Sequence, residues 1–232
     1  MIPKIIHYCW FGGKPLPKYA RKNIESWKKF LPDYEIKEWN ESNFDIDLIP
    51  YTEQVYQEGK FAFVSDFARY WVLYNFGGLY FDTDVKMIKS FEDIIDKGPF
   101  LGIEKNSNKI SVNPGLGMGA EKVMDFYKKM VEFYSSLPKN SESKPYLVEK
   151  TTEFLVKDGF KLEDKLQKVD EIFIYPNDFF NPMNDYTGKI TITPNTHSIH
   201  YYAKSWIKGY SPFRNYLTRK YHSFIKIIND IY

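Results

Sequence analysis

The chain has few of the features that mark secreted, membrane-spanning or nucleic-acid-binding proteins. It has 232 residues but one cysteine, Cys9, so no internal disulfide can form. We find neither a charged-then-apolar leader nor a long uncharged apolar run, so neither export nor a membrane span is indicated. With 32 basic and 30 acidic residues, the formal net charge is only +2. Such a charge creates no general field that would attract nucleic acid. We therefore expect a cytoplasmic protein without a nucleic-acid partner.

What is present indicates one globular domain. Hydrophobic residues make up 43% and charged residues 27%, which are ordinary values for such a domain, and no repeat or low-complexity linker interrupts it. Aromatic residues, at 19%, exceed what a core alone normally requires. Their excess suits stacking on flat ligands such as sugars and bases, but a Tyr-rich and Phe-rich core explains it as well.

Apolar patterning predicts an α/β fold. The β-branched and aromatic run 2–11 is expected to be a buried strand, and the apolar spacing over 19–30 is helical. An alternating segment, 34–39, then predicts a second strand, and this order is typical of a parallel α/β layer. The same patterns predict later strands over 79–81, 100–104, 110–112, 171–175 and 189–193, and helices over 61–76, 121–134 and 144–158.

Asp82 and Asp84 directly follow the apolar segment 79–81. In extended backbone, side chains two residues apart point the same way, so the two carboxylates should share a face. Converging carboxylates need a cation, and Mg²⁺ or Mn²⁺ typically takes one or two of them together with substrate phosphates. This chemistry suits a nucleoside diphosphate leaving group. A D-x-D triplet occurs by chance about once in a chain of this size, so its context decides its meaning.

That context is a helix carrying Ser65-Asp66-Phe67-Ala68-Arg69-Tyr70, followed by Gly77-Gly78-Leu79-Tyr80-Phe81-Asp82-Thr83-Asp84. Asp66 and Arg69 are three residues apart and so share a helix face, where a surface salt bridge worth about 0–1 kcal/mol would also explain them. The combined pattern resembles the sugar-binding region of the DXD glycosyltransferases of family 32, which include yeast-type mannosyltransferases and bacterial capsule enzymes. It is also similar to the catalytic domain of the large clostridial glucosylating toxins.

The resemblance implies a fold and a donor site. The fold would be a single GT-A-type, Rossmann-like domain over 1–211, with a mostly parallel central sheet and added C-terminal helices. Asp82 and Asp84 would hold Mn²⁺ or Mg²⁺ against the donor diphosphate. Asp66 and Arg69 would bind hydroxyls of the donor sugar, and Tyr80 would lie near it. The resemblance thus gives a catalytic set of Asp82, Asp84, Asp66 and Arg69.

Two further segments extend the resemblance. Ile6 to Gly13 is similar to the families' opening strand, which implies that Trp10 stacks on the donor base, worth about 1–3 kcal/mol; a core role fits Trp10 equally well. Ile199 to Trp206 resembles their closing segment. This implies that His200 contacts the metal or phosphate, and that Ser205 and Trp206 bind phosphate oxygens and exclude water. A purely structural histidine is the alternative.

The acceptor side is less well matched. Relatives usually carry a Thr-Gly-Pro turn before a central helix, where this chain has Lys144-Pro145-Tyr146. Asn113, with the glycines after it, is a candidate for lying beside the reacting sugar, since glycine permits close backbone approach. A plain strand-to-helix loop explains the same residues.

The expected function is therefore a retaining, metal-dependent hexose transfer. The donor would be a nucleotide sugar, by the toxin-like opening strand a UDP-hexose, and the acceptor a saccharide or lipid-linked saccharide in capsule, lipopolysaccharide or other cell-surface polysaccharide synthesis. The metal would act as Lewis acid and template, and no catalytic base is assigned. Two alternatives are a haloacid-dehalogenase-like phosphatase with Asp82 as nucleophile, and a non-catalytic carbohydrate-binding module.

The last segment, 212–232, predicts a basic, amphipathic helix. Its apolar face permits docking on an anionic membrane, which would place the protein peripherally at the inner face of the plasma membrane. The same face permits packing on the domain as a covering helix.

Overall fold

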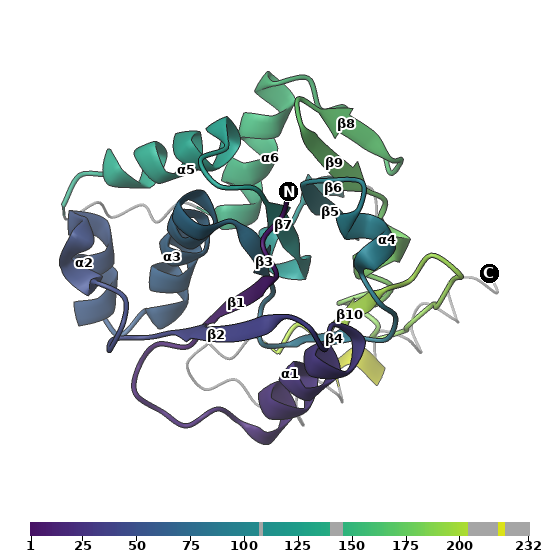
Figure 1. Cartoon of the computed structure of the whole chain (residues 1–232), viewed down its shortest axis with the longest axis horizontal. Coiled ribbons are helices and arrows are strands. Elements are labelled where there is room, and N and C mark those ends of the chain that lie inside the picture. The colour runs from purple at the N-terminus through teal and green to yellow at the C-terminus, as the bar shows by residue number, and fades with distance from the viewer. Residues whose placement is uncertain (107–108, 140–145, 204–217, 221–232) are drawn as a thin grey trace.

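The computed structural model describes residues 1–106, 109–139, 146–203 and 218–220. Its centre is an eight-stranded mixed sheet in the order β2-β1-β3-β7-β5-β9-β8, with β6 paired to β5 (Figure 1). The strands are β1 (Ile5–Cys9), β2 (Glu35–Trp39), β3 (Gly78–Tyr80), β5 (Phe100–Asn106), β6 (Lys109–Val112), β7 (Met118–Ala120), β8 (Gln167–Val169) and β9 (Ile172–Tyr175).

Strand pairing gives this sheet one dominant direction. β1 pairs in parallel with β2 and β3, β5 pairs in parallel with β9, and β7 is antiparallel to both β3 and β5. Five of the eight described strands (β2, β1, β3, β5 and β9) therefore run the same way, and β6, β7 and β8 run against them. The prediction of a mostly parallel central sheet is confirmed.

Helices lie on both sides of the sheet, as Figure 1 shows for α1 and α3. They are α1 (Lys18–Phe30), α2 (Pro50–Gln57), α3 (Phe61–Phe76), α4 (Glu92–Ile95), α5 (Asp125–Ser135), α6 (Leu147–Lys157) and α7 (Asn177–Phe180), with 3₁₀ turns η1 (Ile46–Leu48) and η2 (Pro114–Leu116). A second sheet pairs β4 (Val85–Met87) antiparallel to β10 (Ser198–His200).

Alternation along the strands divides the apolar residues into two cores. Leu79 and Phe81 point to the side of α1, whereas Tyr80 between them joins the core beneath α2, α3, α5 and α6. In the same way, Ile6 and Tyr8 join the core on the side of α1, and Cys9 joins the core beneath α2, α3, α5 and α6. Strand side chains alternate between the two faces of a sheet, and helices cover both faces here. A strand such as β3, which has no charged residue, is therefore expected.

Most elements occur where the pattern predicted them. The predicted β1–α1–β2 unit is parallel, and α3 spans the predicted 61–76, ending where Gly77 adopts a φ of +64° that glycine tolerates. The strand predicted over 189–193 is wrong, because this segment has no pairing strand and makes only a single bridge, Met183 to Ile190. The glycines after Asn113 are also more than a loop, since Met118–Ala120 forms β7 inside the sheet.

One buried histidine ties the first strands to the end of α3. His7 Nε2 lies 2.9 Å from the carbonyl oxygen of Gly77, and the indole of Trp39 donates to His7 Nδ1 at 3.1 Å. Burial lowers the pKa of His7 to about 4. The neutral ring, donating through Nε2 and accepting at Nδ1, satisfies both contacts.

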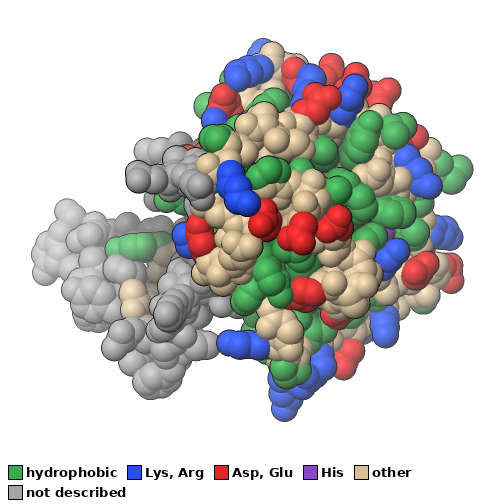
Figure 2. All heavy atoms as spheres, turned by 90° about the vertical axis from the view of Figure 1, so that its left-hand side faces the viewer, with side chains coloured by type: hydrophobic (Ala, Val, Ile, Leu, Met, Phe, Trp, Pro, Cys, Tyr) green, Lys and Arg blue, Asp and Glu red, His purple; other side chains and the backbone are tan. Residues whose placement is uncertain are grey.

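The C-terminal prediction falls mostly outside the described residues. Of the segment 212–232, the structure describes residues 218–220, which are helical. Within the described ranges no helix is both long enough and apolar enough to cross a membrane. Figure 2 shows the left-hand side of Figure 1, where acidic side chains gather near the middle and basic ones are scattered around them.

Candidate metal and donor-sugar site

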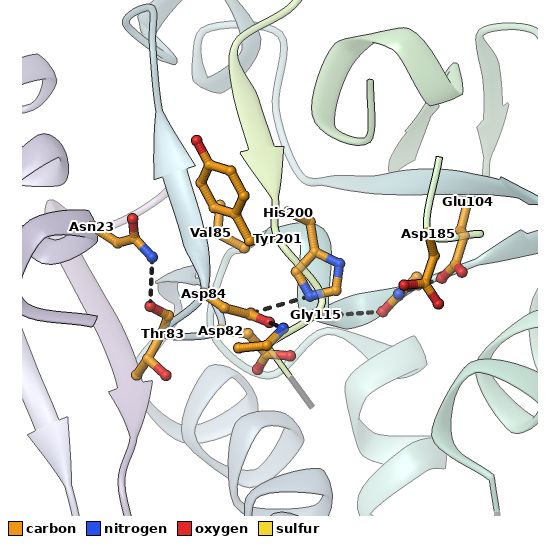
Figure 3. Close-up of polar contacts among 12 residues, drawn as sticks. Asn23, Asp82, Thr83, Asp84, Val85, Glu104, Gly115, Asp185, His200 and Tyr201 are labelled. Carbon is orange, nitrogen blue, oxygen red and sulfur yellow. Dashed lines mark hydrogen bonds and ion pairs between the residues drawn. The ribbon is translucent and has the colours of Figure 1, made fainter. Parts of the chain in front are cut away.

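The two aspartates lie in a turn between two strands. β3 ends at Tyr80 and β4 begins at Val85, whose amide donates to the carbonyl oxygen of Asp82 at 3.0 Å. From α1, the Asn23 amide holds the carbonyl oxygen of Thr83 at 2.9 Å (Figure 3). The two carboxylates therefore converge at the end of β3, as predicted, and the backbone there forms a turn rather than a continued strand.

Asp82, Asp84 and His200 together present three ligand atoms. One atom from each side chain lies within 4.8 Å of the other two. β10 brings the histidine there, since His200 pairs with Val85 of β4, next to Asp84. His200 Nε2 is 3.1 Å from Asp84 Oδ1, and the amide of Ala203 donates to Asp84 Oδ2 at 2.7 Å. Figure 3 shows the imidazole pointing toward the two carboxylates.

This donor set fits a divalent cation. Carboxylate oxygens suit Mg²⁺, Ca²⁺ and Mn²⁺, whereas an imidazole nitrogen is more usual for first-row transition ions, and Mn²⁺ accepts both. Burial disfavours the charged form of His200, but the charge and hydrogen bond of Asp84 outweigh it and raise its pKa to about 8. In return His200 lowers the pKa of Asp84 despite the burial of that carboxyl. A proton on His200 thus occupies the position that a cation would take.

Arg69 connects this group to Asp66. Its guanidinium lies 3.2 Å from Asp66 Oδ1 on one side and 3.2 Å from Asp82 Oδ1 on the other, and only 5% of its side chain is exposed. The predicted pairing of Asp66 with Arg69 on one face of α3 is therefore observed, but it is buried. Nη1 approaches Asp82 without hydrogen-bond alignment, which leaves that N–H able to donate elsewhere. Burial raises the pKa of Asp66 to about 7, although the charge of Arg69 opposes the shift.

Comparison with known proteins finds a family that matches one part of this site. Residues 17–101, which include α3 and the Asp82–Asp84 turn, match the family described as glycosyltransferase sugar-binding region containing DXD motif. Over this stretch the chain is similar to the sugar-binding region of the DXD glycosyltransferases.

Relatives agree with this assignment. Over 118 residues the chain is 31% identical to the uncharacterized glycosyltransferase L373 of Acanthamoeba polyphaga mimivirus, covering 47% of this chain and 45% of that protein. Over 111 residues it is 25% identical to inositol phosphoceramide mannosyltransferase 1 of Schizosaccharomyces pombe (strain 972 / ATCC 24843), covering 43% and 33%. The aligned region thus spans less than half the length of either relative.

Solved structures share the fold. PaToxG glycosyltransferase superposes with a TM-score of 0.51 at 21% identity, over 68% of this chain and 70% of that one. A glycosyltransferase involved in the glycosylation of the major capsid of PBCV-1 gives a TM-score of 0.52 at 14% identity, over 94% and 100%. The predicted GT-A-type fold is confirmed.

Tyr80 and Gly115 contact Asp82 from opposite sides. The Tyr80 hydroxyl donates to Asp82 Oδ1 at 3.1 Å, and the Tyr80 ring lies 4.9 Å beneath the Arg69 guanidinium. On the other side, the Asp82 carboxylate packs so closely on Gly115 that a Cβ there would overlap Asp82 Oδ2. The glycine predicted to permit close approach does so, and the group that approaches it in this structure is Asp82.

Asn113 organises the loop that carries Gly115. Its side-chain oxygen accepts from the amide of Gly115 at 2.8 Å, and its amide nitrogen donates to Glu104. Glu104 was not among the predicted site residues, although an acidic residue directly after the apolar run Phe100–Ile103 was a usable signal. The carboxylate is 9% exposed and faces the same region as His200.

The remaining predicted donor contacts are only partly described. Trp10 follows β1, where its indole donates to the carbonyl oxygen of Lys14 at 2.6 Å, and its half-buried ring also packs against the core beneath α1. A stacking role and a packing role therefore both remain predictions for Trp10. Ser205 and Trp206 lie outside the described residues.

Proposed function

We propose that the protein is a retaining, divalent-metal-dependent glycosyltransferase that moves a hexose from a nucleoside-diphosphate sugar to a hydroxylated acceptor. The observation that carries this proposal is the convergence of Asp82, Asp84 and His200. The two aspartates lie in the stretch that matches a glycosyltransferase sugar-binding region. Two carboxylates and an imidazole fit Mn²⁺ well and Mg²⁺ less well, so we propose Mn²⁺ as the preferred ion. Bound there, the ion would stabilise the charge of a departing diphosphate.

The surrounding side chains would position the donor. Arg69 has an N–H that is not aligned on Asp82, and we propose that it donates to an oxygen of the donor sugar or its phosphate. Asp66, held 3.2 Å from the same guanidinium, would accept from a sugar hydroxyl. Trp10 would stack on the base, for which the toxin-like opening strand favours uracil.

Transfer would then need no protein base. The sugar–oxygen bond to the diphosphate breaks and its electrons leave with the diphosphate. The acceptor oxygen bonds to the same carbon from the same face, and its proton passes to the leaving diphosphate. A metal-bound nucleoside diphosphate leaves readily, which removes the need for the paired acid and nucleophile of glycoside hydrolases.

For the acceptor we propose a saccharide or lipid-linked saccharide of a cell-surface polysaccharide, with a cytoplasmic active site. Support comes from a relative whose name states mannose transfer to inositol phosphoceramide, a lipid. The phosphatase alternative has no comparable support, because the Asp82 carboxylate that it needs as a free nucleophile is held by Tyr80 and paired with Arg69. The family match likewise favours an enzyme over a non-catalytic sugar-binding module.

A donor panel tests the proposal. The protein is incubated with MnCl₂ and UDP-glucose, UDP-galactose, UDP-N-acetylglucosamine or GDP-mannose, and slow donor hydrolysis is followed. We expect one donor to be hydrolysed, with EDTA abolishing the reaction. Asp84→Ala should reduce the rate by more than about 100-fold, beyond the range usual for groups that only support a metal ligand.

Asp33→Ala is the matched control. Asp33 lies between α1 and β2, and its side chain is 77% exposed. Its carboxylate is 3.9 Å from the Lys4 ammonium and contacts no described residue of the site, so its loss should leave hydrolysis unchanged. Full activity of Asp84→Ala, or of the wild type in EDTA, would contradict the metal role.

A further inference from the structure

A second group of buried polar side chains lies next to the Asp82–Asp84–His200 group, on its side away from Asn23 and Thr83. It consists of Tyr202, Glu104 and Asn181, which come from the segment after β10, from β5 and from the segment after α7. All three are at least nine-tenths buried. In Figure 3, Glu104 lies beyond His200 as seen from Asn23. The proposed donor site makes no use of any of them.

Tyr202 has a strained backbone. Its φ of +50° lies in the left-handed region, which costs a residue with a Cβ energy that glycine avoids. Its flanking residues are fixed by Asp84, because Tyr201 donates its amide to the Asp84 carbonyl and Ala203 donates to the Asp84 carboxylate. The strained turn places the Tyr202 ring 4.3 Å from the His200 ring. Strained backbone conformations of this kind cluster at active sites and ligand-binding sites, where they position a functional side chain.

The group also contains polar atoms that lack partners. Asn181 and Glu104 both lie close to the Tyr202 hydroxyl. Within the described ranges, however, neither this hydroxyl nor the Asn181 side-chain oxygen has a partner with the distance and angle of a hydrogen bond, although both are buried. An unpaired buried polar atom destabilises a fold, so native proteins seldom keep one without a ligand or water to satisfy it.

These atoms form a matched set of donors and acceptors. Tyr202 offers an O–H, Asn181 offers a carbonyl oxygen, and Glu104 offers lone pairs beyond those that accept from Asn106 and Asn113. Each hydroxyl of a sugar both donates and accepts, so neighbouring hydroxyls would satisfy the set. The Glu104 carboxylate repels phosphate, which excludes the diphosphate from this position.

We propose that Tyr202, Glu104 and Asn181 form a subsite for neighbouring hydroxyls of a hexose, beside the metal group. This inference rests on the proposed function and assigns part of its substrate. The hexose is either that of the donor or that of the acceptor saccharide, because both would present the same chemistry next to the leaving diphosphate.

Binding measurements on Tyr202→Phe and Glu104→Gln test the subsite. Dissociation constants are measured by calorimetry with Mn²⁺ for UDP against UDP-glucose and for GDP against GDP-mannose. If the hexose is the donor's, both variants bind the nucleoside diphosphate within twofold of the wild type but bind the nucleotide sugar about 3–10-fold more weakly, the usual effect of one lost hydrogen bond.

A second arm detects the acceptor. Saturation-transfer NMR follows methyl glucoside, mannoside and galactoside binding to protein loaded with Mg²⁺ and nucleoside diphosphate. If the hexose is the acceptor's, the variants lose this signal while both nucleotide affinities stay unchanged.

Tyr201→Phe is the matched control, since Figure 3 shows the Tyr201 hydroxyl pointing away from the carboxylates. It should change neither arm. Thermal unfolding separates a structural effect, because removing an unpaired hydroxyl should leave Tyr202→Phe at least as stable as the wild type.

Three outcomes would overturn the subsite. The first is that the variants behave as wild type in both arms. The second is that they weaken nucleoside diphosphate and nucleotide sugar equally. The third is that the wild type binds no nucleotide with Mn²⁺, which would refute the proposed function and the subsite with it.

Discussion

At the scale of single residues, the pairing of β10 with β4 holds His200 beside Asp84, while Tyr80 and Gly115 contact the Asp82 carboxylate. Asp82, Asp84 and His200 were predicted as one group, because each lies in a short contiguous motif. They converge in the structure because β10 pairs with β4. Tyr202 could not be found, since its significance comes from burial and backbone strain. A single sequence contains neither quantity. The sequence also did not decide whether Asp82, Thr83 and Asp84 lie in a strand or in a turn, because the same three residues fit both.

Gly115 provides a test at this scale. A Cβ at Gly115 would overlap the Asp82 carboxylate, which is the flexible end of a side chain and can move away. We therefore expect Gly115→Ala to keep the free energy of unfolding within about 1 kcal/mol of the wild type. Displacing Asp82 should weaken Mn²⁺ binding by about 10–100-fold, measured by calorimetric titration.

Gly119→Ala gives the contrast, because its Cβ would overlap the Phe100 ring inside the sheet. It should lower stability while leaving the Mn²⁺ affinity of the folded protein near the wild-type value. Unchanged Mn²⁺ binding by Gly115→Ala would show that Asp82 is not held as described.

At the scale of elements, predictions succeeded where a segment carried its own boundary signal. α3 was expected over 61–76 because its apolar period ends at two glycines. Three-residue strands such as β4 have no period to detect, and β4 is nevertheless the strand that pairs with β10 and brings His200 to Asp84. The strand predicted over 189–193 has the right alternation, but Ile190 and Ile192 are exposed and no neighbouring strand covers them. Alternating apolar residues indicate that a segment can form a strand. Whether it does depends on a second strand, from elsewhere in the chain, that pairs with it.

His7 makes the junction of β1, β2 and α3 sensitive to acid. Its pKa is about 4 in the folded protein and 6.5 in its ordinary state, so the unfolded chain binds the extra proton between these values. Stability from this residue is therefore complete above about pH 6.5 and is lost as pH falls toward 4. The loss is at most roughly 3 kcal/mol.

Urea unfolding at several pH values measures this effect. His7→Gln keeps a side-chain N–H for the Gly77 carbonyl oxygen but cannot titrate, so the difference in unfolding free energy between it and the wild type should shrink as pH falls from 6.5 to 4. Parallel curves for the two proteins would contradict the assignment.

At the scale of the whole molecule, strand direction gathers the site. β1, β3 and β5 run the same way, so their carboxyl ends lie at one edge of the sheet, where Trp10, Asp82 and Glu104 are found. Ligands of open α/β sheets bind at such an edge. The sequence indicated the parallel β1–α1–β2 unit, but it could not show that β7 enters between β3 and β5 from later in the chain. That insertion joins the first half of the sheet to the second.

Ligand binding should therefore stabilise the whole domain. With Mn²⁺ and nucleoside diphosphate at 100 times the dissociation constant, the gain is about 2.7 kcal/mol, which corresponds to roughly 5–10 °C in Tm for a domain of this size. Differential scanning fluorimetry with MnCl₂ and UDP or GDP measures it. Nucleotide in EDTA should give a much smaller shift, as should Asp84→Ala with both ligands. An equal shift in EDTA would argue against joint binding.

The hydrogen bond from Ala203 to Asp84 closes a loop of 119 residues. During synthesis on the ribosome, the aspartate turn leaves the exit tunnel long before the histidine strand that completes the cation group. A nascent chain consequently completes the Asp82–Asp84–His200 group, and the contact from Ala203 that holds Asp84, only after residue 203 has emerged. Ion capture would then report that the polypeptide has reached its finished topology.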